Sequence, residues 1–224
     1  MPSQEAMTLN PRMTLMELFE THKGLPVHKF PHHIEIYDRL FAELDMPDPT
    51  LLEIGVAHGG SMALWRDYFG PAATIIGVDV QDRTAIQQQV DAKIFTGDQA
   101  DPTFWQLISS QIRPLHIVID DGSHRSADQL ATFNELFPIL EDGGLYIIED
   151  IHTSYRPDYG GGLGLKGSVV ETLKDLIDVI HNTEYGGLGD SHVFSVQIYP
   201  NLAVIQKKSP STWGGSTMRP IHAD

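Results

Sequence analysis

Two short segments of the chain combine the character of a buried strand with side chains that could bind a metal ion. IVIDDGSH and LYIIEDIHTSY each contain an apolar run that ends in two adjacent acids, with a histidine shortly after. Such a run is typical of a parallel strand that ends at the carboxyl edge of a sheet. Four carboxylates brought together at one edge need a cation, so the pattern predicts a hard metal ion at an active site. The four acids are Asp120, Asp121, Glu149 and Asp150.

A glycine-rich loop follows the first expected strand. In LLEIGVAHGGS (51–61) the glycines stand between a strand and a helix, where bare backbone and a helix N-terminus would form the floor of a nucleotide site. The dinucleotide fingerprint G-x-G-x-x-G is not satisfied, because two residues after Gly55 the second glycine is replaced by Ala57. Glu53, inside the strand, suits a cationic amino-acid group better than a diphosphate. We expect Ser61, at the end of the loop, to contribute to the same site.

Polar side chains also end the next two expected strands. Asp79 closes TIIGVDV, where its carboxylate could accept hydrogen bonds from ribose hydroxyls. Asp98 and Gln99 close the third strand in TGDQ, near the expected position of an adenine. Together with the glycine-rich loop, these strand ends favour S-adenosylmethionine over NAD. The expected cofactor contacts are Glu53, Gly55, Ser61, Asp79, Asp98, Gln99 and Asp120.

The elements that must position these side chains alternate along the chain. Strand and helix patterns follow one another from about residue 50 to 183, and two adjacent strands joined by a tight turn follow over 192–208. Asp101 and Ser126 are expected as helix N-caps. Five β-α units and a terminal hairpin predict an α/β fold. We expect a doubly wound, mostly parallel seven-stranded sheet with a C-terminal antiparallel hairpin.

The segments around this core carry separate expectations. Residues 1–45 contain two helix candidates and are expected to form an N-terminal helical cap. Residues 46–208 would form the S-adenosylmethionine-binding domain, and residues 209–224 look like an irregular tail. Glycine-rich loops at 159–167 and 185–191 are open to two interpretations, a mobile lid over the site or an ordinary connection.

The composition limits the class of protein. A length of 224 residues with 41% hydrophobic residues suits one large globular domain. The chain has no cysteine, which excludes disulfides, thiolate zinc sites and a cysteine nucleophile. We find no signal peptide and no apolar run of about 18 residues, so we expect a cytoplasmic protein without a membrane partner. The formal net charge of −15 argues against a nucleic-acid partner.

The same residues resemble those of a known family. The runs LLEIGVAHGGSMALWRDYFG, IIGVDV, IVIDDGSH and IIEDIHTSY are similar to the metal-dependent sugar O-methyltransferases of antibiotic pathways. The macrolide deoxysugar enzymes are the nearest type, with cephalosporin hydroxylase-like and rhamnosyl relatives beside them. The resemblance runs from about Leu18 to Lys208. It implies a Rossmann-like class I methyltransferase fold, S-adenosylmethionine and Mg²⁺ as cofactors, a glycoside or sugar substrate, and a homo-oligomer.

The resemblance also assigns roles to individual residues. His124, three residues after the acid in the D-x-x-H spacing, matches the general base of the family. Asp120 remains for the cofactor side. The chain departs from the family in THKG, where relatives often carry an acid and His22 stands here. The positions that match metal ligands are Asp121, Glu149 and Asp150.

The expected reaction moves a methyl group from a sulfonium to a sugar hydroxyl, while His124 takes the proton of that hydroxyl. Three alternatives stay open. The first is an O-methyltransferase with the same metal and a catechol-like acceptor or other small diol. The second is an oxygenase, although a non-heme iron site uses two histidines and one carboxylate and acids dominate here. The third is a non-catalytic cofactor-binding or assembly protein.

Overall fold

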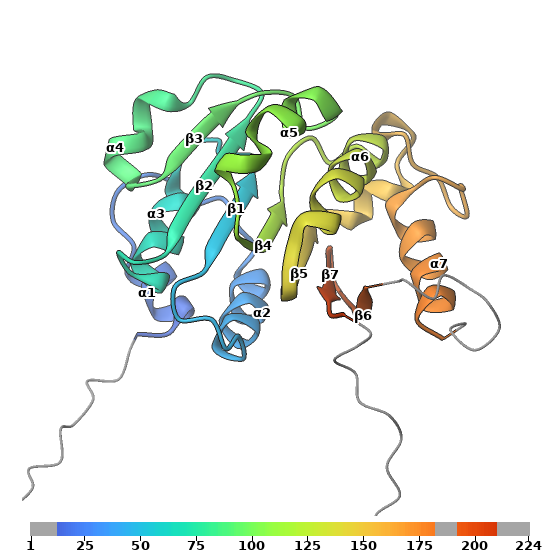
Figure 1. Cartoon of the computed structure of the whole chain (residues 1–224), viewed down its shortest axis with the longest axis horizontal. Coiled ribbons are helices and arrows are strands. Elements are labelled where there is room, and N and C mark those ends of the chain that lie inside the picture. Colours follow the sequence, from blue (N-terminus) through green and yellow to red (C-terminus); the bar gives the residue numbers. More distant parts are fainter. Residues whose placement is uncertain (1–12, 182–191, 210–224) are drawn as a thin grey trace, which may run out of the picture.

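The computed structural model describes residues 13–181 and 192–209 of the chain. In these ranges seven strands form one sheet in the order β3-β2-β1-β4-β5-β7-β6 (Figure 1). Neighbouring strands from β3 to β5 pair in parallel, while β7 pairs antiparallel with both β5 and β6. The predicted fold class is confirmed. The strands are β1 (Thr50–Ile54), β2 (Thr74–Asp79), β3 (Lys93–Thr96), β4 (Leu115–Asp120), β5 (Leu140–Glu149), β6 (Val193–Tyr199) and β7 (Leu202–Lys207).

The helices alternate with the strands. The α-helices are α1 (Leu15–Thr21), α2 (Pro31–Ala42), α3 (Gly60–Phe69), α4 (Gln87–Val90), α5 (Pro102–Ile108), α6 (Ser126–Leu136) and α7 (Val169–His181). The short 3₁₀ turns are η1 (Thr84–Ile86), η2 (Ser109–Gln111), η3 (Phe137–Ile139), η4 (Ile151–Tyr155) and η5 (Pro157–Tyr159). The predicted cap at Asp101 is confirmed, because its side chain accepts a hydrogen bond from the Thr103 amide.

The predicted cap at Ser126 is wrong by one residue. Ser126 is the first residue of α6, and Arg125 precedes the helix without a side-chain cap. The hydroxyl of Ser126 is buried and instead accepts a hydrogen bond of 3.4 Å from the amide of Val169, where α7 begins. Contact between two helices has taken the hydroxyl that the local pattern assigned to capping.

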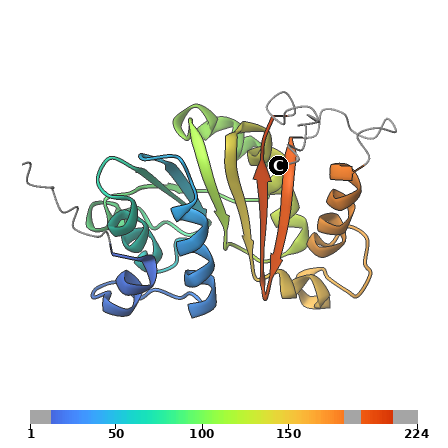
Figure 2. The same ribbon diagram turned by 90° about the horizontal axis from the view of Figure 1, so that it is seen from below.

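Successive side chains of the sheet enter two separate hydrophobic cores, one on each face. Leu51 and Ile117 pack with α1, α2 and α3, whereas Leu52 and Val118 pack with α5, α6 and α7. The result is a three-layer arrangement with helices on both faces of the sheet (Figures 1 and 2). Because both faces are covered, the central strands read as nearly continuous apolar runs.

The two N-terminal helices are part of the first core. Leu15 of α1 and Ile34 of α2 are fully buried in it, and the ring of Tyr37 lies edge-on to Trp65 with centroids 5.3 Å apart. The loop that joins the two helices, residues 22–30, is thereby held against the edge of the sheet. The division into segments 1–45, 46–208 and 209–224 stays a prediction; residues 210–224 and the loop at 185–191 lie outside the described residues.

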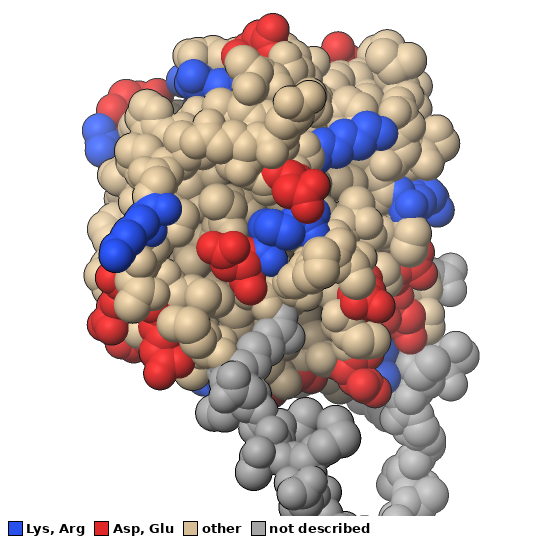
Figure 3. Space-filling model, turned by 90° about the vertical axis from the view of Figure 1, so that its left-hand side faces the viewer, with Lys and Arg blue, Asp and Glu red and all other residues tan. Residues whose placement is uncertain are grey.

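Charged side chains of both signs share the surface. On the face that carries α1, α3 and α4, acidic and basic residues are interspersed between large uncharged areas (Figure 3). In the described ranges, no helix combines the length and the apolar character that crossing a membrane requires.

The two-sided core leads to a stability prediction. Ile119 of β4 is fully buried, whereas Leu107 of α5 is 75% exposed. We expect Ile119→Ala to lower the free energy of unfolding by about 2–5 kcal/mol, because it leaves a cavity beneath the α1–α3 layer. The matched change Leu107→Ala should stay within about 0.5 kcal/mol. Denaturant unfolding of both variants measures the difference, and equal losses would contradict the described core.

Candidate metal and cofactor site

The carboxyl ends of the parallel strands surround a cavity of about 680 Å³. It lies where β1 is flanked by β2 on one side and β4 on the other, the switch point at which open α/β sheets bind ligands. Glu53 and Asp120 lie behind the wall of this cavity, both fully buried. The other predicted site residues line it: Gly55, Ser61, Asp79, Asp98, Gln99, Asp121, His124, Glu149 and Asp150.

The glycine-rich loop is clamped between two strand ends. Gly55 has a φ of +93°, and a Cβ at this position would lie 2.1 Å from the carbonyl oxygen of Asp121. On the other side, the Asp79 carboxylate accepts hydrogen bonds from the amides of Val56 and Ala57, at 3.1 and 3.0 Å. Only glycine allows β1 and the end of β4 to approach so closely, and this contact places Asp121 beside the loop.

The side chain of Asp120 binds its neighbour Gln99 and does not itself line the cavity. Its buried carboxylate accepts two hydrogen bonds, of 3.1 and 3.2 Å, from the amide group of Gln99. The carbonyl oxygen of that amide accepts a bond of 2.7 Å from the Ser123 backbone. Burial raises the pKa of Asp120 to about 6, although the Gln99 bonds oppose the shift. Asp120 therefore holds Gln99, which does line the cavity.

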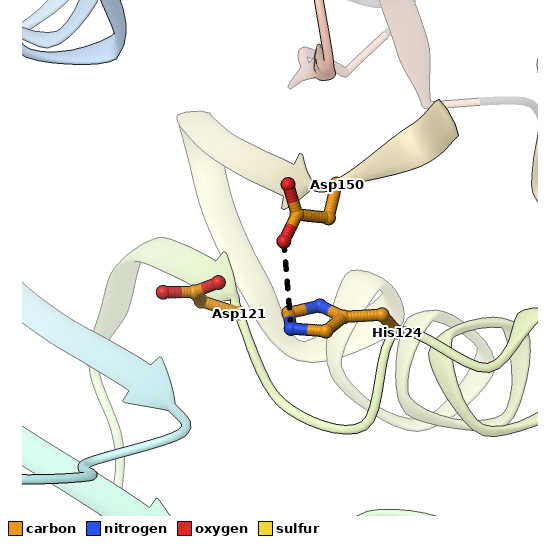
Figure 4. Close-up of side chains that lie close together, drawn as sticks. All are labelled: Asp121, His124 and Asp150. Atoms are coloured by element: carbon orange, nitrogen blue, oxygen red, sulfur yellow. Dashed lines mark ion pairs between the residues drawn. The ribbon is translucent and has the colours of Figure 1, made fainter. Parts of the chain in front are cut away.

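Three side chains form what we call the outer cluster: Asp121, His124 and Asp150. Their ligand atoms all lie within 4.8 Å of one another, and His124 Nε2 is 3.5 Å from Asp150 Oδ2 (Figure 4). His124 and Asp150 both have a positive φ, +57° and +53°, which non-glycine residues seldom adopt. Strain of roughly 1–3 kcal/mol at each residue is typical of positions held for function.

The outer cluster fits a hard divalent cation. Asp150 Oδ1 is buried and, among the described residues, accepts no hydrogen bond. Burial, followed by the charges of Glu149 and Glu53, raises the pKa of Asp121 well above its usual value although Lys29 opposes the shift. A cation would satisfy both carboxylates, since Mg²⁺ takes oxygen ligands. Burial also lowers the pKa of His124, although the charges of Asp150 and Glu149 oppose the shift, and a lowered pKa favours the neutral imidazole that can accept a proton.

The sequence analysis did not predict that a lysine of the chain itself, Lys29, lies among these carboxylates. Lys29, in the loop between α1 and α2, places its ammonium 2.7 Å from Glu53 Oε1, 2.6 Å from Asp121 Oδ2 and 2.5 Å from Glu149 Oε1. We call these three carboxylates the inner cluster. Burial opposes the ammonium charge, but the carboxylates outweigh burial and hold the pKa of Lys29 well above its usual value.

Glu149 has further partners on α2. The imidazole of His33 lies 3.0 Å from Oε2, and the Tyr37 hydroxyl donates a bond of 2.6 Å to Oε1. Burial favours the neutral acid, yet these partners and Lys29 lower the pKa of Glu149 to about 2. A signal was present in the sequence: His33 and Tyr37 are polar residues at i and i+4 on the apolar face of α2.

The predicted metal ligands fall into two groups that share Asp121. Asp121 and Asp150 meet with His124 in the outer cluster, and Glu149 lies with Glu53 and Asp121 in the inner cluster, whose oxygens are also close enough together to hold a metal ion. Glu149 therefore stays a predicted metal ligand beside Asp121 and Asp150. Glu53 is fully engaged as well, because Oε2 accepts hydrogen bonds from the Ser61 hydroxyl at 2.7 Å and the Trp65 indole at 2.9 Å. The loop at 159–167 contributes no side chain to the cavity lining.

The sheet order and the glycine-rich loop define a Rossmann-like class I methyltransferase fold, as the resemblance implied. The family model described as Rhamnosyl O-methyltransferase/CmcI matches residues 17–177, and the chain belongs to this family. The 8-demethyl-8-alpha-L-rhamnosyl tetracenomycin-C 2'-O-methyltransferase of Streptomyces olivaceus is 36% identical and covers 80% of this chain. The mycinamicin VI 2''-O-methyltransferase of Micromonospora griseorubida is 34% identical and covers 81%. These matches span 51% and 48% of the two relatives, so the chain covers about half of their length.

Solved structures agree with this assignment. The MycE methyltransferase from the mycinamycin biosynthetic pathway, in complex with Mg, SAH and mycinamycin VI, superimposes with a TM-score of 0.76. It is 34% identical, and the match covers 92% of this chain and 58% of MycE. A Mg-SAM structure of cmcI gives a TM-score of 0.53 at 20% identity, over 90% and 88% of the two chains, and shows the shared fold.

The close contact at Gly55 leads to a second stability prediction. Gly55→Ala combines an unfavourable φ with a clash against the Asp121 backbone, whereas Gly70→Ala, at φ +83°, meets nothing within 4 Å. Both variants should lose roughly 1–3 kcal/mol through backbone strain. Gly55→Ala should lose about 1–3 kcal/mol more through overpacking. Equal losses in urea unfolding would show that β1 and β4 do not approach as described.

Proposed function

We propose that the chain is a metal-dependent O-methyltransferase that moves a methyl group from S-adenosylmethionine to a sugar hydroxyl of a natural product or glycoside. The observation that carries this proposal is the cavity, where a nucleotide-type loop and a cluster fit for a divalent cation share one sheet edge. The named activities of the family relatives support the sugar as acceptor. Mg and SAH, the demethylated cofactor, bound together in MycE support the cofactor pair.

The cofactor half of the cavity is built from β1, β2 and β3. The Gly55 loop offers bare backbone at the start of α3, and Asp79 and Asp98 stand at the ends of the next strands. Asp79 uses Oδ2 to hold the loop amides and Oδ1 to accept from the Gln81 amide. It therefore shapes the loop as well as facing the cavity, and ribose hydroxyls would approach these same oxygens.

The acceptor half is built from the ends of β4 and β5. Asp121 and Asp150 would hold the divalent ion, which when bound supplies Lewis-acid stabilisation of a developing alkoxide. His124 stands beside them, and burial lowers its pKa, which favours the neutral imidazole that would take the proton of the acceptor hydroxyl. Holding the acceptor oxygen in line with the methyl group is the larger effect, because orientation supplies up to about 7–11 kcal/mol in favourable cases.

Two measurements test the proposed activity in order. Calorimetry should show that S-adenosylmethionine binds the chain, and assays on a panel of deoxysugar glycosides should show methyl transfer that requires Mg²⁺ and stops with a chelator. Absence of cofactor binding would contradict the methyltransferase assignment. Methyl transfer that continues undiminished in chelator would contradict only the role of the metal.

A histidine variant tests the base. His124→Ala should lower kcat at pH 7 by roughly 10²–10⁴-fold, the usual contribution of a positioned general base. The control His181→Ala lies at the exposed end of α7 and should leave kcat unchanged. Full turnover by the His124→Ala enzyme would remove this residue as the base.

The rival functions differ in measurable ways. The outer cluster contains one histidine and two acids, the reverse of the two-histidine, one-carboxylate set of non-heme iron oxygenases. A catechol-type activity would appear as faster methylation of flat aromatic diols than of glycosides in the same panel.

The homo-oligomer that the resemblance implies is part of this proposal, and light scattering of the purified protein measures it.

A further inference from the structure

A second cavity, of about 430 Å³, lies between η4, α7 and the end of β6. Its lining includes Tyr199 and Asn201, from the turn between β6 and β7. Because Leu202 at the start of β7 pairs with Glu149 at the end of β5, this turn lies at the same sheet edge as the metal and cofactor site. The volume is within the range that holds a small organic ligand, and the proposed chemistry does not use this cavity.

The lining of the second cavity is mostly apolar. Two of its side chains, Ile151 of η4 and Leu173 of α7, are buried. Three large ones, Tyr155, Ile177 and Ile198, are 47%, 52% and 57% exposed. A single exposed apolar side chain is ordinary on a protein surface, but three around one cavity are typical of a binding site for an apolar body.

The cavity exists because the cover that α7 gives the sheet ends between β7 and β6. Ile198 of β6 is paired with Ala203 of β7, so the two side chains lie on the same face of the sheet. Ala203 is fully buried in the second core, whereas Ile198 is 57% exposed. The outermost strand therefore presents an apolar surface at its carboxyl end that the described chain does not cover.

The turn η4 joins this cavity to the outer cluster. His152 of η4 lines the second cavity, and its Nδ1 lies 3.7 Å from Oδ1 of Asp150, which lines the first cavity. The side chain of His152 is 44% exposed, so a ligand can lie along it. A ligand that places a hydroxyl at the outer cluster and extends past His152 would bring its next part into the apolar cavity.

The lining does not suit a phosphorylated ligand. Among the described lining residues, the basic side chains are Lys174 and His152. Each of them already faces a carboxylate, since the Lys174 ammonium lies 2.5 Å from Glu171 and His152 faces Asp150. The diphosphate of a sugar nucleotide would find no unpaired cation here, whereas a hydrocarbon ring system would bury apolar surface.

We propose that this cavity, the aglycone cavity, receives the apolar aglycone of the acceptor. The substrate is then a sugar already attached to an apolar ring system, and not a sugar nucleotide. Binding of the aglycone holds the sugar at the outer cluster, so binding energy far from the reacting oxygen orients that oxygen. The inference rests on the proposed function, and it is tested both by kinetics and by binding without turnover.

The kinetic experiment compares methyl rhamnoside, naphthyl rhamnoside and a nucleoside diphosphate rhamnose as acceptors. The wild-type chain should show a KM for the naphthyl glycoside about tenfold lower than for the methyl glycoside, because the naphthyl ring buries apolar surface. The double variant Ile177→Ser with Ile198→Ser should lose this preference. The control Leu107→Ser removes an apolar side chain that is 75% exposed on α5 and should keep it.

The binding experiment separates this inference from the proposed function. The fluorescence of naphthyl rhamnoside measures its binding to the full chain without S-adenosylmethionine. The wild-type chain should bind it, and the double variant should bind it about tenfold more weakly. If no acceptor is methylated but this difference remains, the proposed function fails and the aglycone cavity stands.

Other outcomes would overturn the proposal. Equal KM values for the two glycosides, a lower KM for the nucleotide sugar, or equal binding by wild type and double variant would each contradict it. A double variant that changes the oligomeric state in light scattering, with the preference intact, would show that a second copy of the chain covers the cavity. If the double variant does not fold, Ile198→Trp fills the cavity from an exposed position and should also abolish the preference.

Discussion

The site depends on how the chain offsets the carboxylates that its strands deliver to one sheet edge. Glu53, Asp121, Glu149 and Asp150 lie at or near the carboxyl ends of three neighbouring strands, and each is largely removed from water. Burying an unpaired carboxylate costs several kcal/mol, so the fold is stable only if cations lie among them. One cation, Lys29, is built into the chain. The negative charge that Lys29 leaves uncompensated is what a divalent ion at this sheet edge would offset.

Contacts between residues that are far apart in the sequence hold these carboxylates in place. Gly55 lets β1 and the end of β4 touch, Asp79 ties the loop to β2, and α2 brings His33 and Tyr37 to Glu149. The N-terminal helices are therefore part of the site as well as of the core. A cofactor bound in the Gly55 loop would lie against the same loop of residues 22–30 that carries the buried ammonium.

Much of this arrangement could be predicted from local patterns. Apolar runs with acids at their ends specify both the parallel strands and the residues at their carboxyl edge, and for that reason nine of the eleven predicted site residues line the cavity. Asp120 was harder to place, because neighbouring residues of a strand end point to opposite faces. The pattern could not distinguish the acid that faces the cavity from the acid that holds Gln99.

The role of Lys29 could not be read from the sequence because it depends on long-range packing. Lys29 contacts Glu149, 120 positions away, and no periodicity links a loop lysine to a strand-end acid.

The most direct test of the whole account is a crystal structure with Mn²⁺ and S-adenosylmethionine, with the metal located by anomalous scattering. The account predicts a metal peak at the carboxyl ends of β4 and β5, with Asp121 and Asp150 among its ligands. The absence of any peak at this sheet edge would contradict it.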